Sequence, residues 1–167
     1  MTEPRWLTDT EMRAWAGLLE TYDLIHRLVE LQLREVGGLT MVQYEILTRL
    51  NESPDRSRGM TDLASRMVAS RSGLTYQVGQ LEKAGLLRRT PDPADDRGVL
   101  AVLTDEGRRV LEETAPGHVR VVREGLIDRL SEAQVAQLAD VMDTARTHLR
   151  EVVPLIPPRT RRGRKHG

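Results

Sequence analysis

Apolar residues recur at three- and four-residue spacing along most of the chain, which is the pattern of amphipathic helices. The longest such stripe lies near the N-terminus and consists of Trp15, Leu18, Leu19, Tyr22, Ile25, Val29, Leu33 and Val36. Capping residues and glycine stops divide the pattern into separate elements. Together they predict helices at 9–36, 41–51, 61–67, 71–84, 105–129 and 132–151.

Two short apolar runs after the fourth helix predict strands at 86–90 and 99–103, joined by an eight-residue turn at 91–98 that is rich in proline, aspartate and glycine. Residues 52–59 are expected to form a loop, and Pro116 should kink the long helix that contains it. The predicted fold class is mainly α with a small β-hairpin. Since the first and last helices carry apolar stripes with little to cover them, a homodimer is expected.

Composition narrows the functional classes. The 167 residues include no cysteine, so disulfides, thiolate metal sites and thiol-based redox sensing are excluded. No apolar run is long enough for a membrane helix and no signal-peptide pattern opens the chain, which predicts a cytoplasmic protein. No nucleophile with a base, phosphate loop or cluster of metal ligands occurs at usable spacing. We therefore expect neither an enzyme nor a bound cofactor or metal.

The formal net charge is zero, but the charges are unevenly distributed. Residues 56–104 carry eight basic and five acidic side chains, the tail at 159–167 carries five basic ones, and the remainder is acidic. Because attraction to phosphate acts over a Debye length of about 10 Å, this local excess favours contact with nucleic acid. A random surface mosaic is the alternative. The prolines from Pro154 onward end regular structure, and we expect a disordered basic tail at 154–167.

Segments 61–67 and 71–84 have the spacing of a helix-turn-helix. Inner faces are formed by Leu63, Ala64 and Met67 on the first helix, and by Leu74, Val78 and Leu81 on the second. The outward face of the second helix is polar, and its hydrogen-bonding groups suit base edges and phosphates in a major groove. It comprises Ser70, Arg71, Ser72, Thr75, Tyr76, Gln77 and Gln80. The alternative is an ordinary solvated helix.

The turn after this helix carries Arg97. An arginine on a slender hairpin can enter the narrow, negative minor groove of A·T-rich DNA. Asp95 lies two residues earlier and can orient the guanidinium through a charge-assisted hydrogen bond. The hairpin thus has the features of a wing, although a weak surface ion pair would have the same sequence.

The stretch from Leu63 to Gly107 resembles the MarR family of bacterial winged helix-turn-helix regulators. The matching pieces are LASRM, SRSGLTYQVGQLEKAGLL and DPADDRGVLAVLTDEG, the last corresponding to the family's wing. With weaker similarity on both sides, the resemblance covers about residues 10–152. Two positions depart from the family pattern: Val68 stands where glycine is common, and Tyr76 where a basic residue is common.

The resemblance implies a transcription regulator, usually a repressor, that binds a palindromic DNA operator as a homodimer. It implies helical dimerisation segments at 1–36 and 105–153 and a DNA-binding winged domain at 39–104. It also implies release by a small aromatic or phenolic effector between the dimer helices and the winged domain. Candidate effector-binding side chains are Trp15, Tyr22, His26 and Tyr44, whose rings can equally be core or dimer contacts. A helical dimer that binds another protein, without DNA binding, is the alternative function.

Overall fold

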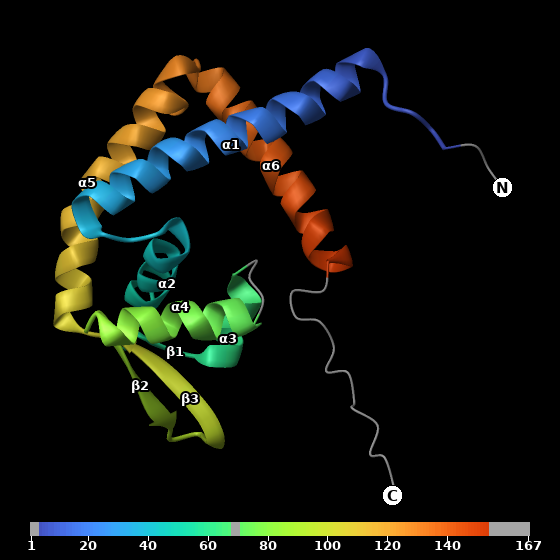
Figure 1. Cartoon of the computed structure of the whole chain (residues 1–167). Helices are drawn as coiled ribbons and strands as arrows, with labels where there is room; N and C mark the ends of the chain where they lie inside the picture. Colours follow the sequence, from blue (N-terminus) through green and yellow to red (C-terminus); the bar gives the residue numbers. More distant parts are fainter. Residues whose placement is uncertain (1–3, 68–70, 154–167) are drawn as a thin grey trace, which may run out of the picture.

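A computed structural model describes residues 4–67 and 71–153 of the chain (Figure 1). Its helices are α1 Asp9–Gly37, α2 Met41–Asn51, α3 Met60–Arg66, α4 Arg71–Lys83, α5 Asp105–Gly125 and α6 Glu132–Val152, with a short 3-10 helix, η1 Ile127–Arg129, between the last two. Strands β1 Ser57–Gly59, β2 Leu87–Asp92 and β3 Asp95–Leu103 form an antiparallel sheet in the order β1-β3-β2. The predicted fold class is confirmed. The tail at 154–167 lies outside the described residues.

Capping boxes begin three of the helices, as the sequence indicates. At Thr8, Thr40 and Ser131 the hydroxyl accepts a hydrogen bond from the amide three residues on, and that residue's side chain accepts one from the cap's own amide. The predicted stop of α1 is also observed, because Gly38 adopts the left-handed conformation, with φ of 62°.

We call α2, α3, α4 and the sheet the winged part of the molecule. The hydrophobic core lies in this part and extends to the second half of α1 and to the start of α5. The inner faces predicted for the helix-turn-helix are buried there: Leu63, Ala64, Met67, Leu74, Val78 and Leu81 are all at most 2% exposed. This packing fixes α4 against the rest of the winged part and leaves its opposite face outward.

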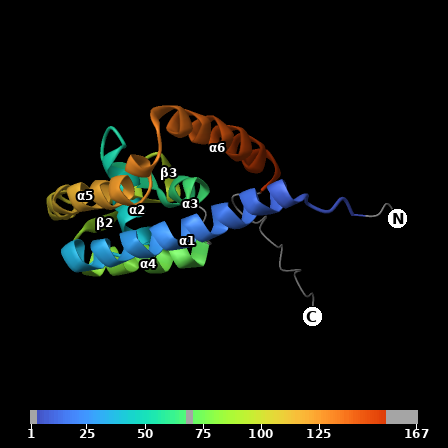
Figure 2. The same cartoon turned by 90° about the horizontal axis from the view of Figure 1, so that it is seen from above.

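Two helical segments extend away from this core (Figure 2). The first half of α1 projects from the body, and α6 has no buried residue. Both carry half-exposed apolar side chains, including Trp15, Leu18, Leu19, Tyr22, Val141, Leu149 and Val152. No helix in the described part of the chain is long and apolar enough to cross a membrane.

Helices α1 and α5 lie side by side, and small residues bring them close. The amide nitrogen of Gln32 donates to the carbonyl oxygen of Thr114 at 3.3 Å. A Cβ at Gly37 would lie 2.6 Å from the Thr114 hydroxyl, and one at Gly117 would collide with the Gln32 amide. Helix α5 continues through Pro116 and changes direction between its yellow and orange parts in Figure 1, as expected for an internal proline.

The base of the hairpin is joined tightly to α5. Thr104 caps this helix: its hydroxyl accepts a hydrogen bond from the Gly107 amide at 3.0 Å and donates to the carbonyl of Gly85 at 2.7 Å. A side chain at Gly107 would collide with the carbonyl oxygen of Leu86. The winged part and α5 therefore meet without a linker.

Two predictions around the sheet are wrong. Residues 57–59 of the expected 52–59 loop form β1, which pairs with β3. The expected eight-residue turn at 91–98 is a tight turn at Pro93–Ala94, because both strands continue beyond the predicted ends. The Asp92 carboxylate accepts the Ala94 amide at 2.9 Å and stabilises this turn. The helix predicted at 105–129 also differs from the structure, since α5 ends at Gly125 and residues 127–129 form η1.

Candidate nucleic-acid interface

Helix α4 presents a polar face to solvent. Its inner residues anchor it in the core, whereas Thr75 is exposed and Tyr76 is 62% exposed. Gln77 and Gln80 are partly exposed. These four side chains offer hydroxyl and amide groups, which can donate and accept hydrogen bonds with base edges.

The start of the helix is described only in part. Arg71 and Ser72 lie in its first turn, where backbone amides point toward a ligand such as phosphate, but their side chains are outside the description. Ser70 and Val68 belong to the segment between α3 and α4, which lies outside the described residues. Their expected roles stay predictions.

The tip of the hairpin contains a bulge at Arg97. Pro91 pairs with Val99, whereas Asp92 pairs with Asp95, so residues 96–98 of β3 have no partners on β2. A Cβ at Gly98 would lie 2.7 Å from the Cβ of Asp92, which explains why glycine suits this fold-back. Bulges change the direction in which a strand presents its residues. The expected Asp95–Arg97 hydrogen bond stays a prediction, because the Arg97 side chain is not described.

A groove of about 360 Å³ separates the hairpin from the helices. Its lining comes from the end of β1, the start of α3, α4 and both wing strands: Gly59, Met60, Thr61, Thr75, Arg89, Asp92, Asp95, Gly98 and Val99. The groove shows that Thr75, on the outward face of α4, and the tip of the hairpin border the same surface. Figure 1 shows α4 above the hairpin on this side of the molecule.

The acidic group at the end of α4 is neutralised. Hydrogen bonds from Arg89 hold the pKa of the Glu82 carboxyl below its usual value. Arg88, the neighbouring residue on β2, is exposed. The surface beside α4 therefore carries no uncompensated charge from Glu82 that would repel phosphate.

The four side chains predicted to bind an effector do not lie together in the structure. Trp15 and Tyr22 are 52% and 60% exposed on α1, and the Tyr22 ring lies 5.5 Å from His26. Tyr44 instead packs against the core from α2, with its ring 4.9 Å from that of His118 on α5. The described ring contacts thus form two pairs rather than one cluster.

His118 is a candidate that the sequence reasoning missed. It continues a buried series on α5 formed by Gly107, Leu111 and Thr114, at spacings of four, three and four residues. This periodicity was a usable signal. Burial lowers the pKa of His118 and raises the pKa of the Tyr44 hydroxyl, so both groups favour their neutral forms.

Three buried side-chain atoms have no hydrogen-bond partner among the described residues: Oε1 of Gln32, Oγ1 of Thr48 and Nδ1 of His118. The first and the last concern the contact of α5 with α1. The Gln32 amide lies against Gly117, the residue before His118, so both atoms belong to the junction of α1 and α5. An unpaired buried polar atom costs free energy, which a molecule with matching groups can recover.

Comparison with known proteins identifies the family. The MarR family model matches residues 39–99, from the start of α2 into the wing. Sco3205, a MarR family transcriptional regulator from Streptomyces coelicolor whose crystal structure contains DNA, is 42% identical; the alignment covers 89% of this chain and 93% of that one, with a TM-score of 0.84. The chain belongs to the MarR family.

Two further relatives agree with this assignment, the first of them described as a MarR family transcriptional regulator. AbsC from Streptomyces coelicolor is 40% identical over 89% of this chain and 99% of its own, also with a TM-score of 0.84. The transcriptional activatory protein BadR from Rhodopseudomonas palustris is 36% identical over 88 residues, about half of each chain. The resemblance seen in the sequence is confirmed, and the chain is a MarR-family transcriptional regulator.

Proposed function

We propose that this regulator binds a specific DNA operator as a homodimer, with α4 in the major groove and the wing in the adjacent minor groove. The observation that carries the proposal is the exposed polar face of α4, which borders one groove together with the arginine-bearing hairpin. The regulator with 42% identity was crystallised in complex with DNA, which supports the same use of this fold here.

In this proposal residues 39–104 read the DNA. Thr75, Tyr76, Gln77 and Gln80 face base edges, with Ser70, Arg71 and Ser72 at the end of the helix nearest the phosphates. Arg97 enters the minor groove, oriented by Asp95. Contacts of both kinds together fix the position of the protein on its site.

Residues 1–36 and 105–153 form the dimer interface. The apolar faces of the first half of α1 and of α6 are largely exposed among the described residues of one protomer, and burying such a face contributes about 25 cal/mol per Å². A two-fold dimer places two recognition helices about one turn of DNA apart, roughly 34 Å, and its preferred operator is then palindromic.

A small aromatic or phenolic molecule is proposed to control release of DNA. The site favoured by the structure is Tyr44 with His118, where Gln32 Oε1 and His118 Nδ1 can each accept a hydrogen bond from a hydroxyl group. Trp15, Tyr22 and His26 are assigned instead to dimer contacts, since they lie on or beside the exposed half of α1.

The first experiment selects bound fragments from the host genome and measures affinity for the recovered site by fluorescence anisotropy. We expect affinity to fall steeply with salt, because several phosphate contacts release counterions. A protein-binding module without DNA binding would retain no fragment. A reporter gene behind the recovered site then distinguishes repression, which we propose, from the activation indicated by BadR's name.

Arg97→Ala is expected to weaken operator binding about tenfold while leaving the dimer intact, because hydrogen bonds from a charged group to minor-groove acceptors are worth about 1.5–3 kcal/mol. Arg146→Ala is the matched control, since Arg146 lies on α6 and pairs with Asp143 at 2.6 Å. Unchanged affinity of the Arg97 variant would remove the wing from the mechanism.

Substitution of Thr75 or Gln77 should alter which base is preferred at one position of each half-site. The measurement compares affinities for a set of single-base operator variants. If affinity falls equally on all of them, these side chains contact only phosphates.

The effector site is tested with His118→Phe, which keeps a ring against Tyr44 but removes Nδ1. A panel of simple phenols and benzoic acids is added to the operator complex, and release is measured. We expect any active compound to lose its effect on this variant. His148→Phe on the exposed surface of α6 is the control, and loss of response in both variants would contradict the assignment.

A further inference from the structure

We propose that Arg58 and Glu82 are positioning residues that fix the angle of the wing relative to the recognition helix. The inference rests on the proposed DNA binding. It concerns side chains that have no place among the expected DNA contacts, and its basis is a row of three residues across the sheet.

The row consists of Arg58 on β1, Ala101 on β3 and Arg89 on β2, each directly opposite the next. Residues opposite each other in antiparallel strands project from the same face of a sheet. Ala101 is fully buried, so this is the face that packs on the helices. Both arginines therefore leave the sheet toward the helices, one on each side of a small central residue.

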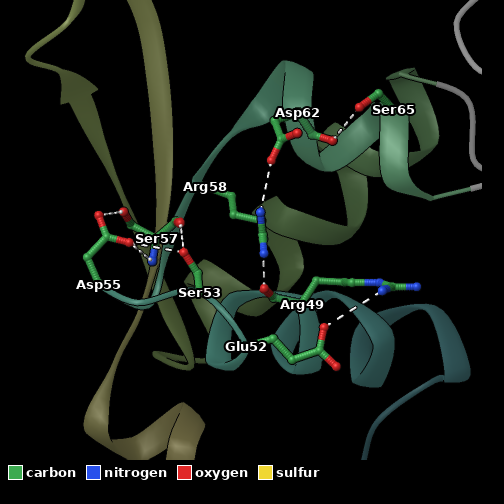
Figure 3. A network of polar contacts seen from close by, with 8 residues as sticks. All are labelled: Arg49, Glu52, Ser53, Asp55, Ser57, Arg58, Asp62 and Ser65. Carbon is green, nitrogen blue, oxygen red and sulfur yellow. Dashed lines mark hydrogen bonds and ion pairs between the residues drawn. The ribbon is translucent and has the colours of Figure 1, made fainter.

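Arg58 joins three elements at one edge of the sheet (Figure 3). Its Nε donates to the carbonyl oxygen of Arg49 near the end of α2 at 2.8 Å, and its terminal nitrogen donates to the Asp62 carboxylate on α3 at 3.1 Å. Only 18% of the side chain is exposed. The planar guanidinium holds both partners in a fixed geometry that a lysine cannot reproduce.

The segment before Arg58 is itself fixed. Ser53 is buried, and its hydroxyl donates to the carbonyl oxygen of Ser57 at 2.7 Å. The Asp55 carboxylate accepts the amide of Ser57 at 3.2 Å and its hydroxyl at 2.7 Å. These hydrogen bonds hold the pKa of Asp55 below its ordinary value. Strand β1 therefore presents Arg58 from a rigid turn, as Figure 3 shows.

Glu82 makes the connection at the opposite edge. One carboxylate oxygen of Glu82 accepts a hydrogen bond from the backbone amide of Arg89 at 2.8 Å. The other accepts a hydrogen bond from Nε of Arg89 at 2.7 Å and forms an ion pair with a terminal guanidinium nitrogen at 2.6 Å. The end of α4 is thus bonded to both the backbone and the side chain of β2. Two residues on, Pro91 has no amide hydrogen, so Arg89 is the last such anchor on this edge before the tip.

Beyond this row the sheet narrows. One more row, Gly59, Leu100 and Thr90, includes all three strands, and from Pro91 onward the hairpin has two. From Arg89 to its end at Asp92, β2 extends about 10 Å, at roughly 3.3 Å per residue. A rotation of about 10° at the row would move the end of the strand by about 2 Å, which is enough to break a hydrogen bond to DNA.

The first part of the test measures the wing without DNA. Because the chain lacks cysteine, Ala94→Cys accepts a single fluorescent dye at the tip. Glu82→Gln and Arg58→Lys should each increase the fast motion of this dye in time-resolved anisotropy. Glu112→Gln is the matched control, because Glu112 and its partner Arg108, 3.0 Å apart, are both exposed side chains of one helix, α5. Unchanged dye motion in both the Glu82→Gln and the Arg58→Lys variant would overturn the inference.

The second part is a double-mutant cycle with Arg97→Ala. In the native background we expect Glu82→Gln and Arg58→Lys each to weaken operator binding about fivefold. Glu82→Gln should change the unfolding temperature little, since the ion pair of Glu82 with Arg89 is partly exposed and such pairs contribute little to stability. In the Arg97→Ala background the same variants should lose less than twofold. Equal losses in both backgrounds, or no loss in either, would overturn the inference. If the native chain binds no DNA fragment, the proposed function fails with it.

Discussion

The two halves of α1 carry the same apolar stripe but have opposite surroundings. Val29 and Leu33, in the second half, are 3% and 0% exposed, whereas Trp15 and Tyr22, on the same face of the first half, are 52% and 60% exposed. The second half is covered by α2 and α5, whereas the apolar side chains of the first half stay exposed in the part of the chain that the structure describes. Periodicity therefore identifies the face that needs burial, but not the chain that buries it.

The difference extends to the whole molecule. The winged part has a hydrophobic core of its own, whereas α6 has no buried residue. Substitutions in the first region should change folding of the protomer, and those in the second should change association. The following predictions separate these two outcomes.

The largest effect is expected from Leu149→Glu on the apolar face of α6. A carboxylate without a partner in an apolar interface costs several kcal/mol, and a two-fold interface contains one from each protomer. The dimer should therefore weaken by more than about 100-fold. Thr144→Glu, on the polar side of the same helix, should leave the dimer intact. Sedimentation equilibrium measures both. A dimeric Leu149 variant would place the interface elsewhere.

Leu33→Ala should lower the free energy of unfolding by about 3 kcal/mol, the usual cost of a cavity in a packed core. Leu18→Ala, on the same stripe but 45% exposed in the protomer, should act instead through the dimer. Urea denaturation at several protein concentrations distinguishes them: the loss at Leu18 should shrink under conditions where the native chain is monomeric. A persistent loss there would mean that α1 is covered within one chain.

Two glycine substitutions test the close contact between the start of α5 and the winged part. Gly107→Ala should cost about 1–3 kcal/mol, because the new methyl group meets the Leu86 carbonyl. Gly79→Ala, on α4 with open space around it, should stabilise the helix by up to about 1 kcal/mol. Thermal unfolding measures both changes, and operator affinity shows whether DNA needs the space at Gly79. Equal tolerance of both substitutions would contradict the close approach.

The smallest effect concerns pH. Burial lowers the pKa of His118 in the folded state, so the unfolded chain takes up the proton more readily. The stabilisation is complete above the ordinary histidine pKa of about 6.5 and is lost as the pH falls through the lower folded value. His118→Gln should flatten this dependence between pH 7.5 and 5, measured by urea denaturation. A slope that stays unchanged in the His118 variant would refute the prediction.

Local signals predicted most of the fold. The capping boxes at Thr8, Thr40 and Ser131 place helix starts correctly because their hydrogen bonds join residues three apart. Strand β1 was missed because three residues carry no periodicity and pair only with β3, more than forty positions later. The tight turn at Pro93–Ala94 was missed because Asp92 closes it and a bulge absorbs the extra residues.

The candidate site was predictable to a similar extent. The polar face of α4 follows from helix geometry alone. The Tyr44–His118 contact does not, because it depends on how α2 and α5 pack, and neither residue has a local signal for the other. The row formed by Arg58, Ala101 and Arg89 depends on strand register, which the sequence does not give for so short a sheet.

The hydroxyl of Thr104 bonds the chain after α4 to the first turn of α5, so one side chain belongs to both regions. His118 lies fourteen residues further along that helix, about 21 Å away at 1.5 Å per residue. Helix α5 therefore connects the hairpin, fastened at its first turn, to the effector candidates beside the bend at Pro116. A tilt of the segment before Pro116 would be passed to the wing, because the Thr104 hydroxyl holds that segment to the chain after α4.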